Sequence, residues 1–284
     1  MGYRKTQEEV ERIQKFMGPA RFTGQELGIS FKTSWEFARD VLPPIFEPVG
    51  SKSDGTCDAY ALAANYQSAY CGRFDGGIVM LFCKYGDIEG YYQLTEIMSA
   101  GLAVSSGREM LGEIKKEGTA RLWKDGDQYN GSVEARGLTL FEIDAQITGP
   151  EQAPKTVKSN GFDVKMFPHT NGHGLQYPPL LNIWDITNNF SSYREGTGTL
   201  TWGHSKWDPV DTIPIVSTGT AVATEYENYS PLLRQEQLED PDNVFPQYLW
   251  GRSFDDPTFY PIANRWRGVD SLNIDPDRQD LANR

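Results

Sequence analysis

Residues 103–118 read AVSSGREMLGEIKKEG, and this stretch lies between two series of predicted strands. Two adjacent lysines, Lys115 and Lys116, stand near its end, after the tripeptide Gly107-Arg108-Glu109. A lysine amine is almost fully protonated at neutral pH, but apolar surroundings or a second ammonium group favour the neutral, nucleophilic form. A neutral amine can attack a ketone and form a Schiff base. The alternative is a pair of solvated surface lysines, which is the more common arrangement in soluble proteins.

The chain on both sides of residues 103–118 has the pattern of β-strands. Apolar and polar side chains alternate in short segments, and turn residues such as Asp125-Gly126-Asp127 separate these segments. The segments span residues 59–65, 77–84, 90–94, 118–123, 130–136, 139–147, 162–167, 180–187, 200–202 and 213–222. Many short strands with few helices predict a mainly β (α+β) fold. Its antiparallel sheets should curl into a partly closed barrel, because closure leaves few unpaired edges.

Two helices are predicted at the periphery of this barrel. Residues 6–17 have one apolar face and begin with a capping box formed by Thr6 and Glu9. A second helix is predicted for residues 34–42. It ends before Pro43-Pro44, since the residue that precedes a proline disfavours helical backbone.

Composition and charge exclude several classes of partner. The formal net charge is −12, so neither nucleic acid nor an anionic membrane, which attract basic proteins, is expected as a partner. No run of 18 apolar residues is present, and no apolar segment follows the N-terminus, so no membrane span and no secretory signal are predicted. Three cysteines without metal-ligand spacing indicate a reducing compartment and predict a cytoplasmic location.

No metal site and no cofactor are predicted. His169 and His173 have a spacing that can hold a metal ion on a helix, but Pro168 and Asn171-Gly172 make this segment a turn. The sequence contains no dinucleotide-binding fingerprint, no phosphate-binding glycine loop and no Gly-x-Ser-x-Gly nucleophile motif.

Gly107-Arg108-Glu109, a spacer of about five residues and Lys115-Lys116 resemble the signature of the acetoacetate decarboxylase family. The resemblance covers about residues 20–226 and includes Asn160-Gly161-Phe162-Asp163-Val164-Lys165. It implies a cone-like barrel that encloses a Schiff-base lysine. Lys115 is then the candidate nucleophile, and Lys116 assists it electrostatically. Acetoacetate decarboxylase is itself the standard example of a lysine activated by a neighbouring cation, so this role comes from the family.

The chain departs from the family pattern at several polar positions. The family has an arginine before the first strand, where this chain has Gly24-Gln25-Glu26. One family glutamate aligns with Ala61, and a second aligns near residues 73–76, where no glutamate stands. The family tyrosine two residues before the Schiff-base lysine is Glu113 here. These departures resemble the diverged, biosynthetic members of the superfamily, some of which perform aldol addition or dehydration on larger ketones.

The resemblance makes Arg108, Gln25 and Tyr60 the candidate substrate-binding residues. Arg108 would bind a substrate carboxylate. Its alternative role is structural, in which it holds a buried carboxylate such as that of Glu109.

Glu113 is a candidate proton donor or acceptor beside the nucleophile. If residues 113–116 are extended, Glu113 and Lys115 share one face and Lys116 lies on the other. In a helical turn the two side chains would diverge, and Glu113 would be a solvated carboxylate. We expect the pKa of Lys115 to be depressed, because burial and the Lys116 ammonium both disfavour its charged form.

The chain divides into two predicted regions. Residues 1–227 form the barrel domain with its N-terminal helix, and residues 228–284 form a C-terminal extension rich in proline and aromatic residues. Its prolines exclude a long regular element, while its aromatic content is too high for a disordered tail. The extension is expected to pack on the barrel or on a neighbouring subunit of a homo-oligomer.

These observations predict a lyase that forms a Schiff base with a small keto substrate. The substrate is expected to be a ketone or β-keto acid larger than acetoacetate, and the reaction a decarboxylation in a biosynthetic pathway. Aldol chemistry, dehydration, cyclisation and isomerisation on the same scaffold are the alternatives. A further alternative is a barrel that binds a small molecule without covalent chemistry. An ion pair between Lys115 and Glu113 or Glu117 would favour it, because that pair keeps the amine charged.

Overall fold

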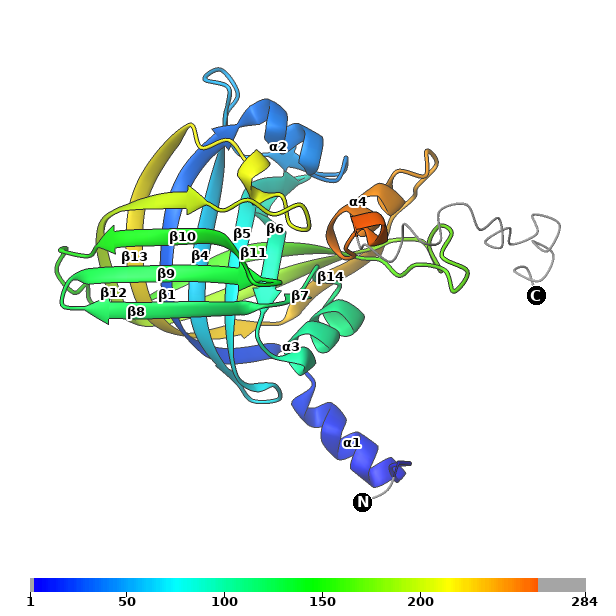
Figure 1. The fold of residues 1–284 in the computed structure, drawn as a ribbon. Coiled ribbons are helices and arrows are strands. Elements are labelled where there is room, and N and C mark those ends of the chain that lie inside the picture. Colours follow the sequence, from blue (N-terminus) through cyan, green and yellow to red (C-terminus); the bar gives the residue numbers. More distant parts are fainter. Residues whose placement is uncertain (1–2, 260–284) are drawn as a thin grey trace.

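The computed structural model describes residues 3–259, and a ring of seven strands is its main feature (Figure 1). In spatial order the ring strands are β11, β6, β5, β4, β1, β13 and β12, and pairing between β11 and β12 closes the ring. Their bounds are β1 (Ala20–Ser34), β4 (Thr56–Ser68), β5 (Gly72–Tyr85), β6 (Ile88–Met98), β11 (Lys155–Lys165), β12 (Leu180–Trp202) and β13 (Ser217–Ser230).

The sheet is mixed, although almost all of its pairs are antiparallel. β6 and β11 run parallel over two pairs, Tyr91 with Gly161 and Tyr92 with Phe162. A closed ring with an odd number of strands cannot alternate strand direction at every step, so one seam must be parallel. The predicted mainly β fold is confirmed, but the ring is not a regular antiparallel barrel.

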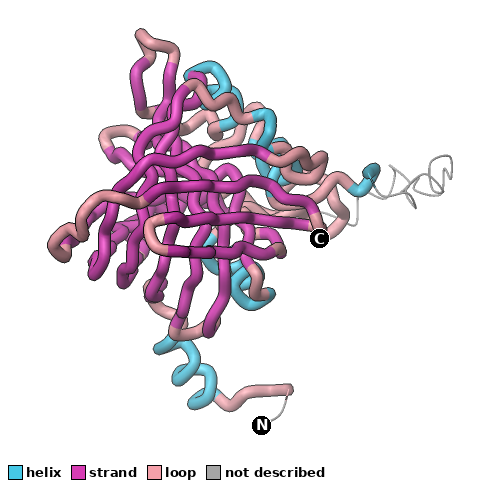
Figure 2. Tube along the Cα trace, turned by 60° about the vertical axis from the view of Figure 1, so that its left-hand side comes forward, coloured by secondary structure: helices cyan, strands magenta, loops and turns pink. Residues whose placement is uncertain are grey.

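A second layer covers the outer face of the ring. β12 extends beyond the ring and pairs with β10 (Leu138–Gln146), which is followed by β9 (Gln128–Ala135) and β8 (Thr119–Asp125) (Figures 1 and 2). Leu27 and Ala63 of the ring belong to one buried core together with Val133 and Ile143 of this layer. Since side chains alternate along a strand, the neighbours of these ring residues face the ring interior.

Both predicted helices are present outside the ring. α1 (Gln7–Phe16) begins with the predicted capping box, in which the Thr6 hydroxyl accepts from the Glu9 backbone N–H at 3.2 Å. α2 (Trp35–Val41) has Ser34 as its N-cap. The shorter elements are β2 (Glu47–Pro48), β3 (Gly50–Ser51), β7 (Lys116–Glu117), α3 (Gly101–Ser106) and the 3-10 turns Val210–Thr212 and Pro257–Phe259. No helix within residues 3–259 is long and apolar enough to cross a membrane.

The sheet continues past the predicted domain boundary at residue 227. That position lies inside β13, and β14 (Leu232–Gln237) adds a further strand to β12. We therefore propose a boundary at about residue 237. Beyond it, α4 (Phe245–Arg252) buries Phe245 and Leu249 in the main core, so this part of the extension packs on the sheet. Residues 260–284, which include part of the predicted aromatic extension, lie outside the described residues.

Candidate active site

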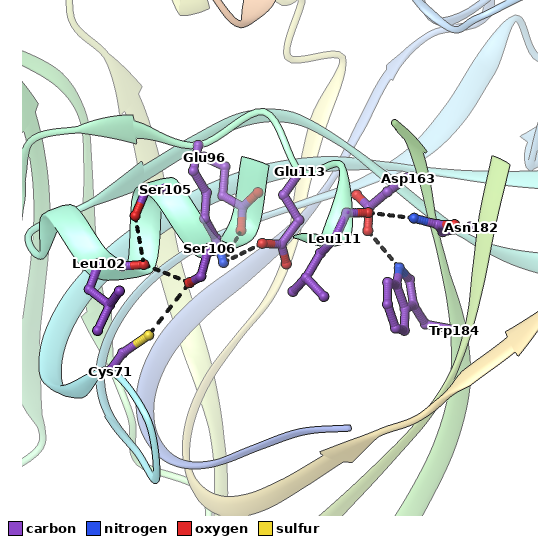
Figure 3. Close-up of polar contacts among 11 residues, drawn as sticks. Cys71, Glu96, Leu102, Ser105, Ser106, Leu111, Glu113, Asp163, Asn182 and Trp184 are labelled. Atoms are coloured by element: carbon purple, nitrogen blue, oxygen red, sulfur yellow. Dashed lines mark hydrogen bonds and ion pairs between the residues drawn. The ribbon is translucent and has the colours of Figure 1, made fainter. Parts of the chain in front are cut away.

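The two lysines follow a tight turn that places them at the edge of the ring. α3 runs directly into a π-helical turn, η1 (Gly107–Leu111), which ends at Gly112 with a φ of 89°. A glycine adopts this left-handed backbone at little cost, and a side chain here would collide with Lys165. The Asn182 amide also donates a hydrogen bond of 2.6 Å to the Leu111 carbonyl, which anchors the turn to β12 (Figure 3).

The segment that follows this turn places the side chains of Glu113 and Lys115 on the same side of the backbone, as expected for an extended segment. Lys115 Nζ lies 2.5 Å from Glu113 Oε2 and 3.5 Å from Glu96 Oε1, a carboxylate of β6. All three side chains line a cavity inside the ring. Figure 3 shows the carboxyl groups of Glu96 and Glu113. The Lys115 side chain is only 12% exposed, so its amine lies between two carboxyl groups with little contact with solvent.

The pKa of Lys115 is raised, contrary to the expectation from sequence. Burial alone would lower it, but the nearby Glu113 and Glu96 carboxylates and the hydrogen bond to Glu113 have the larger combined effect. The expectation assumed that burial and an adjacent uncompensated ammonium would dominate, whereas Lys115 lies between two carboxyl groups and Lys116 pairs with carboxylates of its own. Burial raises the pKa of Glu96. The positive charge of Lys115 lowers this pKa, but it offsets only part of the increase.

Lys116 points away from Lys115 and is neutralised by carboxylates of its own. Its Nζ lies 2.8 Å from Asp208 Oδ1 and 3.1 Å from Asp255 Oδ1, and it donates to the Trp207 carbonyl at 3.2 Å. Asp255 also pairs with Arg136. The predicted electrostatic help from Lys116 is therefore not what the geometry supports. Lys116 joins the turn that precedes it to the segment after α4.

Replacing Lys116 by methionine is expected to destabilise the fold. The change leaves the largely buried carboxylates of Asp208 and Asp255 without their shared cation, at a cost of about 3 kcal/mol. Urea unfolding measures this loss, and Lys116→Arg is the matched control because it retains the charge. A methionine variant as stable as the wild type would show that the ion network is not structural.

The three candidate substrate-binding residues lie outside the Lys115 cavity. Arg108 stacks on Phe254 with its guanidinium 4.7 Å from the ring centre, and burial lowers the pKa of this guanidinium. Gln25 is exposed and donates to Glu225 at 3.2 Å. Tyr60 donates to Glu26 at 2.7 Å and does not line the cavity. Arg108 thus lies against an aromatic ring and not beside a buried carboxylate, since Glu109 is exposed. Gln25 and Tyr60 do not line the Lys115 cavity.

Two acidic residues of the cavity were not predicted from sequence. Glu96 is the second carboxylate at Lys115, and Asp163 of β11 lies near the pair and accepts from the Trp184 indole N–H at 2.6 Å (Figure 3). Burial raises the pKa of Asp163, and the negative charge of Glu113 raises it further. A signal for Asp163 was present, since it stands between the apolar residues Phe162 and Val164 of a predicted strand.

All seven ring strands contribute to this cavity, which has a volume of about 120 Å³. Its walls are mainly aromatic and aliphatic. The aromatic residues that line it are Phe22, Tyr66, Phe74, Tyr91 and Trp184. A buried amine, three carboxyl groups and an apolar wall can together bind a small carbonyl compound and move protons around it.

Solved structures with the same fold include decarboxylases and a biosynthetic enzyme. The acetoacetate decarboxylase from Legionella pneumophila subsp. pneumophila str. Philadelphia 1 has a TM-score of 0.67 and 17% identity, over 79% of this chain and 88% of that chain. A second match is the enduracididine biosynthesis enzyme MppR complexed with the condensation product of pyruvate and imidazole 4-carboxaldehyde. It has a TM-score of 0.65 and 17% identity, over 78% of this chain and 90% of that chain. At these identities the likeness establishes the fold.

The sequence comparisons assign the chain at the level of the family. No curated protein matches it. The model of the family described as acetoacetate decarboxylase (ADC), however, matches residues 6–236. This range includes the whole ring and the Lys115 cavity and ends before α4. The chain therefore belongs to the acetoacetate decarboxylase family, as a diverged member.

Proposed function

We propose that this chain is a Schiff-base lyase in which the amine of Lys115 condenses with the carbonyl group of a small substrate. The observation that carries the proposal is the position of Lys115 in the ring cavity, 2.5 Å from Glu113 and 3.5 Å from Glu96. A nucleophilic lysine needs a group that removes its proton and a pocket that excludes water. Glu113 supplies the first, and the closed ring with its aromatic wall supplies the second.

Proton balance supports this role even though the ion pair keeps Lys115 charged. Condensation of an ammonium and a carbonyl group gives a protonated imine and one water molecule, without a net change in protons. Glu113 accepts a proton before the amine attacks. The departing carbonyl oxygen then takes up two protons, one returned by Glu113 and one from the attacking nitrogen, and leaves as water. The protonated imine is a cation at the position of the former ammonium. The carboxylates that stabilise the ammonium therefore also stabilise this electron-accepting intermediate.

The carboxyl groups favour reactions in which protons must be moved beside the imine. Aldol cleavage or addition and dehydration need an acid and a base at carbons near the imine, and Glu113, Glu96 and Asp163 could serve these roles. The imine accepts the electron pair of the breaking bond, and a carboxyl group then returns a proton. Decarboxylation uses the same imine and releases carbon dioxide. The condensation product bound by the related MppR structure is consistent with the first group of reactions.

A second candidate function is non-covalent binding of a small molecule. The close contact between Lys115 and Glu113 favours it, because a permanently charged amine does not attack a carbonyl group. The two functions differ in one observable property, which is the formation of a covalent imine.

Borohydride trapping distinguishes them. The protein is incubated with butanone, pyruvate or other small carbonyl compounds, treated with borohydride, digested and analysed by mass spectrometry. A substrate-dependent mass increase on Lys115 is expected, since borohydride reduces an imine to a stable secondary amine. Labelling spread over surface lysines, or no labelling with any carbonyl compound, would favour the non-covalent function.

A further inference from the structure

The Lys115 cavity contains more acidic than basic groups. Among the described residues that line it, Lys115 is the only lysine, no arginine or histidine is present, and Glu96, Glu113 and Asp163 supply three carboxyl groups. One amine can compensate one carboxylate fully and a second in part. Burial raises the pKa of both Glu96 and Asp163, and the negative charge of Glu113 raises both pKa values further. An anionic substrate group would add to this excess of acidic groups, whereas a cationic substrate group would reduce it.

Apart from Glu113 Oε2, which pairs with Lys115, two acceptors in the cavity wall have no hydrogen-bond partner among residues 3–259. They are Glu96 Oε2 and Gln93 Oε1, both of which are buried, and the Glu96 side chain is only 3% exposed. Buried polar atoms are almost always satisfied, so these two acceptors on one strand are available to a hydrogen-bond donor that a ligand brings. Because β6 also carries Tyr91 on the cavity wall, such a donor would lie beside an aromatic ring.

The aromatic wall suits a cation as well. Tyr66, Tyr91 and Trp184 all line the cavity, and aromatic faces attract ammonium groups, most strongly when the ion is removed from water. An engineered apolar cavity of about 150 Å³ holds benzene. The buried part of the substrate is therefore limited to a few carbon atoms in a cavity of about 120 Å³.

We propose that the substrate of this site carries a positively charged group of the alkylammonium class near its carbonyl group. The carbonyl part of this statement rests on the proposed Schiff-base function, whereas the preference for a cation rests on the cavity wall alone. The cation would lie against Glu96 Oε2 and Gln93 Oε1, with the carbonyl carbon directed to Lys115. Acetoacetate, which is an anion, would be a poor substrate. Its turnover should be far below the roughly ten per second that is typical of enzymes.

Calorimetry with two small ions of similar size tests the preference without any covalent step. n-Butylammonium is expected to bind at least about tenfold more tightly than butyrate, which corresponds to about 1.4 kcal/mol. Glu96→Gln should reduce this ratio, and the matched control Glu142→Gln, which removes an exposed carboxylate of β10, should leave it unchanged. Failure of n-butylammonium to bind, an equal or higher affinity for butyrate, or an unchanged ratio in Glu96→Gln would overturn the proposal.

Competition locates the binding site and separates the two proposals. n-Butylammonium should slow the borohydride trapping of butanone on Lys115, and butyrate should not. If butanone never labels Lys115 while the calorimetric preference holds, the Schiff-base function is wrong and the cation site stands. If Lys115 is labelled and butyrate is the stronger ligand, the Schiff-base function stands and the cation site is wrong.

Discussion

Replacing Lys115 by arginine is expected to abolish imine formation and to lower turnover of any carbonyl substrate by on the order of 10⁴-fold or more. Arginine retains the positive charge between Glu113 and Glu96, so the buried carboxylates keep a cationic partner. Its guanidinium is protonated at all accessible pH values and is not a nucleophile. The variant therefore separates loss of chemistry from loss of stability, which a change to alanine would not do. Borohydride trapping and turnover measure the first, and urea unfolding measures the second.

Lys116→Arg is the matched control for this change. The two lysines are adjacent in sequence but face different partners, so the control should keep imine formation on Lys115. If Lys116→Arg abolished trapping while Lys115→Arg retained it, the nucleophile would be the other lysine. If both variants kept full activity, the reaction would not involve an imine on either residue.

Local patterns predicted the strands of this fold but not the way in which they close. The alternation of apolar and polar residues is a property of each segment and located most of the ring strands. The seam between β6 and β11 joins Tyr91 to Gly161, which are 70 residues apart, and its direction follows from the odd number of ring strands. The sequence-based boundary at residue 227 lies inside β13, and the pairing of β14 with β12 beyond it is also non-local.

The same distinction between local and distant information applies to the site. Sequence proximity and the family resemblance made Lys115 the candidate nucleophile. Period-two alternation predicted that Glu113 lies beside it, and the ion pair between the two side chains agrees with that placement. The partners of Lys116 could not be predicted, since Asp208 and Asp255 come from segments far along the chain. Glu96 was missed because it follows an irregularity in the pairing of β5 with β6, which changes the alternation established by Tyr91 and Gln93.

Glu113→Gln is expected to move the pH dependence of imine formation to lower pH. Glu113 is the nearest carboxylate to Lys115 and contributes most to raising the pKa of its amine, while burial acts in the opposite direction. Without this carboxylate, the lowering of the Lys115 pKa by burial is opposed less strongly, so this pKa falls. Each unit of that fall increases the neutral amine about tenfold at a pH well below the pKa. We expect a shift of at least about one unit in the rate of borohydride trapping, measured between pH 6 and 10.

Turnover should change in the opposite direction. Glutamine cannot accept the proton of Lys115 or return it to the substrate, and loss of a general acid–base group typically costs about 10²-fold or more. Faster trapping at neutral pH combined with slower turnover would thus assign both an electrostatic and a proton-transfer role to Glu113. Glu117→Gln is the control, because it removes an exposed carboxylate two residues from Lys115 and outside the cavity.

Stability gives an independent measurement of the same ion pair. The pKa of Lys115 is higher in the fold than the ordinary lysine value, so the pair stabilises the protein below that value. Its contribution is lost only as the pH rises through the raised pKa. Glu113→Gln should therefore be less stable than the wild type at neutral pH, and the difference should narrow in strongly alkaline solution. Equal stability at neutral pH, together with an unmoved trapping profile, would mean that Glu113 does not hold the Lys115 amine in its charged form.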